Sequence, residues 1–321
     1  MFSRRQVTYQ NHLSKTKRER GDLLKKQLTI NTVDFIETED LTHFLSLCFK
    51  NDPTSKIFFL RGFESRHRLC AFDATYDEKR IGLTTAWKNP FHPHTTYVST
   101  AIDPRFRHYD VEGKLLKRVE SYATVEHPLQ TSFWEANDYL KSFHRSVGFK
   151  EIRKTYEPTL EVQSFQYFVT QTDQIMTFKQ ISTDQLLRRN VVQLVQSTYE
   201  QTHQANPPAT FDVNKWDHIV CNTNTLLEGS FLLTQGDEVF AFAMLHKTEK
   251  SKTLELGWRG SQTLEGISSV LLLTEQQIGY AKKHGFRYLE AEVDTTDPYF
   301  TSVLEAYPFS SEPAWVTYQK R

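Results

Sequence analysis

The sequence has little cysteine and no long apolar run, and both absences narrow its class. Its three cysteines, Cys48, Cys70 and Cys221, lie far apart with no CxxC spacing, which predicts buried thiols in a reducing compartment rather than a disulfide framework. No N-terminal apolar run has the form of a signal peptide, and no run reaches the roughly 18 apolar residues of a membrane span. We therefore expect a cytoplasmic protein that does not enter a membrane.

The chain also lacks net charge, since 39 Lys and Arg residues balance 39 Asp and Glu residues and the sequence pI is near 7.2. Such balance argues against a general nucleic-acid or membrane surface. Residues 1–27 are the exception, because eight Lys and Arg residues there stand against two acidic ones. This stretch predicts a basic, solvated N-terminal extension on the first domain, and an arm for nucleic acid or an acidic partner is the alternative.

Several chemical motifs are absent as well. The sequence has no Walker loop, no GxGxxG, no GxSxG and no glycosylation acceptor. Two histidines, His92 and His94, flank a proline, but no third close ligand accompanies them. We expect no metal site.

What the sequence does contain is one order of strands and helices written twice. The first series has strands at 32–36, 68–75, 79–87, 96–102 and 129–135, and helices from 38, at 111–122 and at 138–147. The second has strands at 230–234, 238–246, 253–258 and 287–293, and helices at 186–201, 213–222, 267–284 and 298–306. A chain of 321 residues also favours two domains. We expect the basic extension at 1–27 and domains at 28–170 and 175–321, with a linker near 171–174.

Two motifs recur with these elements. The first is a strand followed by Ile102-Asp103-Pro104-Arg105-Phe106-Arg107 and then Leu115-Leu116. The later one is carried in the first half by Asn137, Leu140, His144, Gly148 and Phe149, and in the second by Asp297, Phe300, Leu304, Pro308 and Phe309. The order and motifs resemble the GNAT superfamily of N-acetyltransferases over roughly residues 30–321. The resemblance implies an α/β (α+β) chain of two tandem GNAT domains, each a mixed, mostly antiparallel sheet flanked by helices.

The resemblance also implies acetyl-CoA as co-substrate. In this family a strand edge pairs with the pantetheine arm, and backbone N–H groups of the next helix hold the pyrophosphate. In the second half these positions are the edge Leu256-Gly257-Trp258, the loop Thr263 and Gly266, the helix start Ile267-Ser268-Ser269, and Asp297. Thr263 stands where the family has Arg, and Arg259 just upstream is a substitute.

In the first half the corresponding residues are Arg107 and Asn137. There Asp110 and Glu112 take the small-residue positions of the loop, where their charge opposes a pyrophosphate. The sequence therefore favours the second half for CoA.

Acetyl transfer needs a base for the amine and often an acid for the leaving thiolate. The family's usual acid position holds His144 in the first half and Leu304, which cannot donate a proton, in the second. Glu255 is the candidate base in the second half, with Glu292 as another. Water, Tyr299 or Tyr307 would have to protonate the thiolate there.

The leading hypothesis is an acetyl-CoA-dependent N-acetyltransferase that acts on a small amine or amino-acid-like metabolite by direct attack on the thioester. A non-catalytic tandem GNAT that binds acyl-CoA or a partner protein is the alternative. A third reading is a tRNA-dependent peptidyltransferase, although the charged coiled-coil arm of such enzymes is missing. The oligomeric state stays open.

Overall fold

The computed structural model describes residues 28–50, 52–107, 109–164 and 174–321. These residues form two compact units. The first comprises the described residues up to Ser132, with Ser142–Lys150 and Gln319–Arg321, and the second comprises Phe133–Lys141 and Glu151–Tyr318. The predicted boundaries at 28–170 and 175–321 stay a prediction, and the predicted basic extension at 1–27 and most of the linker lie outside the described residues.

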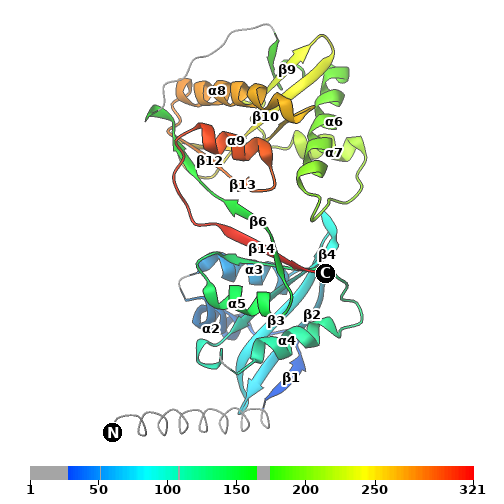
Figure 1. The fold of residues 1–321 in the computed structure, drawn as a ribbon, viewed down its shortest axis with the longest axis vertical. Helices are drawn as coiled ribbons and strands as arrows, with labels where there is room; N and C mark the ends of the chain where they lie inside the picture. Colours follow the sequence, from blue (N-terminus) through cyan, green and yellow to red (C-terminus); the bar gives the residue numbers. More distant parts are fainter. Residues whose placement is uncertain (1–27, 51, 108, 165–173) are drawn as a thin grey trace, which may run out of the picture. The chain divides into compact units, whose positions relative to one another are not determined.

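The first unit contains a sheet covered by helices (Figure 1). Strands β1 (Thr29–Thr32), β2 (Arg68–Tyr76), β3 (Lys79–Asn89) and β4 (His92–Ile102) pair antiparallel in sequence order, and β5 (Leu129–Trp134) pairs parallel with β4. Helices α2 (Thr38–Phe49) and α3 (Pro53–Phe63) precede β2, and α4 (Val111–Glu120) joins β4 to β5. Helix α5 (Asp138–Ser146) runs from one unit into the other.

The hairpin of β2 and β3 shows how local sequence sets this sheet. Tyr76 pairs with Lys79, so only Asp77 and Glu78 lie in the turn. Both have positive φ, at 48° and 62°, which a two-residue turn of type I′ requires. On one face of the sheet, Leu45 and Phe59 are fully buried with Leu83, and burying each such side chain stabilises by about 1.5–3 kcal/mol.

The second unit repeats much of this order. Its sheet follows the order β7-β12-β11-β10-β9-β8, in which β11 and β12 are parallel and the other pairs antiparallel. The strands are β7 (Thr159–Glu161), β8 (Ile175–Thr177), β9 (Phe231–Gln235), β10 (Glu238–Lys247), β11 (Thr253–Ser261) and β12 (Tyr288–Ala291). Figure 1 shows α6 (Gln185–Thr202) and α7 (Val213–Val220) on one side of it, and α8 (Ile267–Lys283) and α9 (Pro298–Ala306) on the other.

Three strands pair with strands from the other half of the sequence. Strand β7 belongs to the first half of the chain but pairs with β12. Strand β14 (Trp315–Lys320), the last of the chain, lies between β5 and β6 (Lys150–Tyr156), and β13 (Val293–Asp294) pairs with β6. The prediction of an α/β (α+β) chain with mixed, mostly antiparallel sheets and flanking helices is confirmed.

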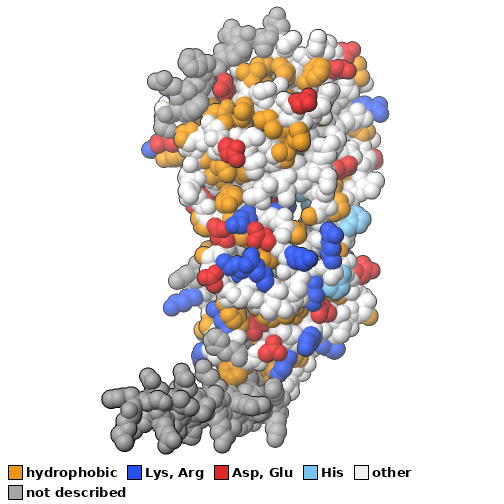
Figure 2. All heavy atoms as spheres, in the orientation of Figure 1, with side chains coloured by type: hydrophobic (Ala, Val, Ile, Leu, Met, Phe, Trp, Pro, Cys, Tyr) orange, Lys and Arg blue, Asp and Glu red, His pale blue; other side chains and the backbone are white. Residues whose placement is uncertain are grey.

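Two further features bear on the class of protein. In the part of the chain that the structure describes, no helix combines the length and apolar character that crossing a bilayer requires. The same residues contain no group of three or more His, Cys, Asp or Glu side chains placed to hold a metal ion. Figure 2 shows apolar and charged side chains interspersed on the face that it draws, and large exposed apolar side chains include Phe35 and Leu264.

Candidate functional site

In the second unit, β11 loses one of its two neighbouring strands halfway along. Strand β12 pairs with β11 only as far as Leu256 opposite Ala291, whereas β10 stays paired up to Ser261. Among the described residues, therefore, 257–261 have a partner strand on one side only. We call the space on the other side the β11 gap.

A β-bulge at the start of the gap decides which way the side chains point. Ala243 pairs with Arg259 and Leu245 with Leu256, so two residues of β11 oppose the single Met244 of β10. A bulge of this kind interrupts the alternation of side chains along a strand. As a result Leu256 and Arg259 both face α8 and α9, which an uninterrupted strand would not allow.

Arg259 lies inside the protein, and its guanidinium is bonded by the chain itself. The side chain is 1% exposed. Its Nη1 donates to Thr274 Oγ1 at 2.8 Å, and its Nε and Nη2 donate to the Gly257 carbonyl at 3.3 and 3.2 Å. The guanidinium also lies over the Phe300 ring, 4.3 Å from its centre. Burial lowers the pKa of Arg259 to about 9, against the opposing effect of the Asp297 carboxylate.

Asp297, predicted to touch the cofactor, begins α9. Its carboxylate accepts the backbone N–H groups of Tyr299 and Phe300 at 2.9 and 3.1 Å, the usual role of an N-cap. Desolvation raises its pKa to about 6, although the two N–H groups and Arg259 act in the opposite direction. The Tyr299 hydroxyl, 2% exposed, donates to the Ser261 carbonyl at 3.0 Å.

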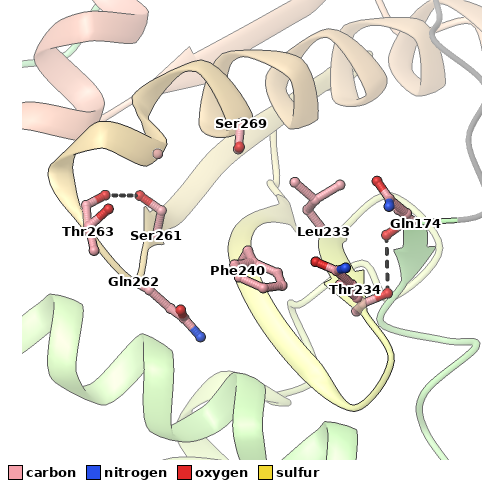
Figure 3. Close-up of a pocket in the computed structure, with 10 residues that line it drawn as sticks. Gln174, Leu233, Thr234, Phe240, Ser261, Gln262, Thr263 and Ser269 are labelled. Atoms are coloured by element: carbon pink, nitrogen blue, oxygen red, sulfur yellow. Dashed lines mark hydrogen bonds between the residues drawn. The ribbon is translucent and has the colours of Figure 1, made fainter.

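The loop after β11, residues 261–266, carries the predicted phosphate positions. It leads into α8 beside a cavity of about 370 Å³ lined by Ser261, Thr263, Gly266, Ser269, Thr234 and Phe240 among others (Figure 3). None of the described residues that line the cavity is charged. Ser261 Oγ donates to the Thr263 carbonyl at 2.6 Å. A Cβ added at Gly266 would lie 2.5 Å from Ser261 Oγ, which is too close. The glycine therefore makes room for Ser261.

The remaining residues predicted in this half are placed around these features. Ile267 is half-buried at the start of α8, Ser268 is exposed, and Leu256 lies in the core. Trp258 turns to the α6 side, where its ring centre is 4.9 Å from that of Tyr199. Glu255 is half-buried and lies opposite Glu290. Its pKa is raised, chiefly by desolvation and to a lesser extent by the Glu290 carboxylate.

Sequence reasoning missed a group of side chains on the α6 side. The His203 ring stacks on Tyr199 at 3.8 Å, and its Nε2 is 4.0 Å from Asp294 Oδ2. Arg153 donates to that carboxylate at 2.8 Å. Tyr199 and Trp258 connect this group to β11. The only sequence signal was the helical spacing of Tyr199 and His203, which is common in any packed helix.

The first unit contains a matching separation of strands. Strands β4 and β5 are paired at Thr96 opposite Leu129 and at Tyr97 opposite Gln130. Beyond that point β4 continues to Ile102, with β3 as its one partner strand in the described part of the chain. We call this point the β4 fork. Gln130 is 2% exposed and Thr96 fully buried, and within the described residues Gln130 Oε1 and Thr96 Oγ1 have no hydrogen-bond partner.

The two carboxylates that sequence reasoning noted lie just before α4 and in its first turn. Asp110 is exposed, has φ of 55° and precedes α4, and its carboxylate folds towards Gly113. Glu112 is 3% exposed, and Oε1 has no hydrogen-bond partner among the described residues. Burial raises the pKa of Glu112 to about 7. Arg107 donates to the Cys48 carbonyl at 3.3 Å.

The two other predicted residues of this half have structural contacts. His144 is 7% exposed and packs edge-on against Phe143 and Phe149. Asn137 Oδ1 accepts the Leu140 N–H at 3.1 Å at the start of α5. Asn137 and Arg107 belong to different units.

Comparison with solved structures identifies the fold. A GCN5-related N-acetyltransferase from Sphaerobacter thermophilus is 14% identical, with a TM-score of 0.59, and the alignment covers 91% of this chain and 95% of that one. A tandem GNAT protein from the clavulanic acid biosynthesis pathway is 11% identical, with a TM-score of 0.53, and the alignment covers 91% and 98%. The chain therefore has the GNAT fold, and the coverage fits a tandem layout. No family model and no curated protein matches it.

Proposed function

We propose that this protein is an acyl-CoA-dependent N-acyltransferase, with acetyl-CoA as donor and a small amine or amino-acid-like metabolite as acceptor. One feature carries the proposal. In each unit two parallel strands separate, and the first of them leads through a loop into the N-terminus of a helix, α4 or α8. An extended thioester with an anionic end suits this arrangement, because strand edges offer hydrogen bonds and helix N-termini favour anions.

The donor supplies an activated acyl group when bound, and the protein must supply hydrogen bonds and a proton acceptor. Candidates to hold the anionic end are the N–H groups at the start of α8, with Thr263, Gly266 and Ser269, or those of α4, with Arg107. A neutral carboxyl at Glu112 would repel phosphate less than the sequence suggests, since its pKa is about 7.

For a donor bound in the second unit, the proposed proton acceptor is Glu255. Its raised pKa makes it a better base at neutral pH than an ordinary carboxylate. His144 is a weaker proposal as acid, because a side chain 7% exposed between two phenylalanine rings has little access to a leaving thiolate.

A non-catalytic acyl-CoA binder is the second candidate. It is favoured by Leu304, which packs against the core of the second unit at the position where the family has its acid. The two candidates differ in turnover and not in binding.

The test is an assay of thiol release from acetyl-CoA with a panel of small amines, in which the acylated product is identified by mass spectrometry. The whole chain is compared with Glu255→Gln and with Glu265→Gln, which removes an exposed carboxylate from the loop of the same unit. Amine-dependent thiol release with a matching product supports the transferase. Acetyl-CoA binding without release under any amine would leave the non-catalytic binder.

A further inference from the structure

The sequence places a small residue, Gly266, in the loop after β11, where a ligand can approach the backbone, but side chains of the chain itself fill the space beside Gly266 and beside two glycines of β11. The ring of His246 lies against Gly257 so closely that an added Cβ would overlap it. At Gly260 an added Cβ would meet Thr198 Cγ2 at 2.5 Å, and at Gly266 it would meet Ser261. Three glycines from 257 to 266 thus accommodate side chains of the same unit.

Two backbone carbonyls of β11 are likewise bonded by side chains of the second unit. Arg259 binds the Gly257 carbonyl through two nitrogens and Tyr299 binds the Ser261 carbonyl. Both side chains are at most 2% exposed. A ligand laid along this edge would have to displace a buried guanidinium that is also bonded to Thr274 and stacked on Phe300.

At the β4 fork of the first unit, two polar side-chain atoms have no partner among the described residues. Gln130 Oε1 and Thr96 Oγ1 are buried, and no described residue bonds them. Because buried polar atoms in native proteins are nearly always bonded to protein, water or ligand, these two are expected to meet a polar molecule. Among the described residues, the second unit also has buried polar atoms without a partner: the amide of Gln277 in the middle of α8, and Thr198 Oγ1, which lies beside Gly260 of β11. There the carbonyls of Gly257 and Ser261 are nevertheless bonded by Arg259 and Tyr299.

We infer that the second unit fills its own donor site: Arg259 and Tyr299 bond the Gly257 and Ser261 carbonyls of β11, so acyl-CoA binds in the first unit alone. The inference rests on the proposed function for the choice of ligand. It reverses the expectation from the sequence, in which the small residues of the loop before α8 favoured the second half for CoA. The Asp110 carboxylate is exposed, so rotation of its side chain can clear the N-terminus of α4.

Calorimetric titration of acetyl-CoA into the whole chain tests this with two pairs of variants. Arg107→Ala probes the first unit, and Arg105→Ala removes an equal charge two residues away, from a side chain that is 74% exposed. Thr263→Glu places a negative charge in the loop that leads into α8, and Thr263→Gln is its neutral control. If Thr263→Glu fails to fold by circular dichroism, Ser269→Glu in the first turn of α8 replaces it.

The expected result is a loss of affinity of at least about tenfold in Arg107→Ala, with the other variants within about threefold of the wild type. A tenfold loss in Thr263→Glu but not in Thr263→Gln would overturn the inference. Absence of binding to the wild type would refute the proposed function, while the conclusion that the second unit is filled would stand.

Discussion

The buried carboxyl of Glu112 predicts how the free energy of unfolding changes with pH. Its carboxyl lies in the first turn of α4, 3% exposed, and burial raises its pKa from the ordinary 4.5 to about 7. Between these two pH values the unfolded chain is ionised at this residue while the folded protein holds the proton. Stability due to this group is therefore fully present below pH 4.5 and is lost as pH rises towards 7.

The size of the effect follows from the same two values. Each pKa unit corresponds to about 1.4 kcal/mol, so the free energy of unfolding should fall by about 3 kcal/mol over this range because of Glu112. Glu112→Gln removes the ionisation and nearly keeps the shape. We expect the variant to match the wild type near pH 4.5 and to exceed its stability by up to about 3 kcal/mol at pH 8.

The assay is urea unfolding at several pH values, followed by tryptophan fluorescence, with Glu126→Gln as control. The Glu126 side chain is 77% exposed, so its replacement should change stability by less than about 0.5 kcal/mol at any pH. Parallel curves of stability against pH for Glu112→Gln and the wild type would refute the reasoning.

Three further predictions concern single positions. Asp110→Gly should keep the free energy of unfolding within about 1 kcal/mol of the wild type, because relief of a left-handed backbone offsets the loss of a helix-dipole interaction. Calorimetry on the same variant should show tighter acetyl-CoA binding. Arg259→Met should still fold, with a urea midpoint close to that of the wild type, because the cost of burying a cation offsets its lost hydrogen bonds; a loss above about 4 kcal/mol would contradict this. Glu78→Gly should stabilise the hairpin by about 1 kcal/mol in thermal unfolding, because its φ is 62°, and unchanged stability would argue against a type I′ turn.

Elements with local signals could be predicted from the sequence. The helix expected at 298–306 is α9, which begins after Asp297 and a proline, and the hairpin expected around Asp77 and Glu78 is β2 and β3. The first strand was expected at 32–36 but forms at Thr29–Thr32. Helix α3 was missed, although Asp52 before Pro53 is a normal N-terminal signal.

The partners of β7 and β14 could not be predicted. An alternating apolar pattern identifies a strand and its buried face, but it does not say which strand lies beside it. For that reason a sequence written as two consecutive repeats gave no sign that β7 pairs with β12, or that β14 lies between β5 and β6.

The same limit applies to the candidate site. Thr263, Gly266 and Ser269 were expected near one another, and they line one cavity because they lie on one loop and helix start. Arg259 was considered as a phosphate ligand, but the bulge at Gly257 and Trp258 turns it into the protein. Such a bulge depends on the register with β10, which the sequence of β11 alone does not contain.

The most direct test of the central claim is the stoichiometry of acetyl-CoA binding to the whole chain, measured by calorimetry before any substitution. The account predicts one acetyl-CoA per chain, bound in the first unit. Two per chain would contradict the self-filled second unit, and none would contradict an acyl-CoA-dependent transferase.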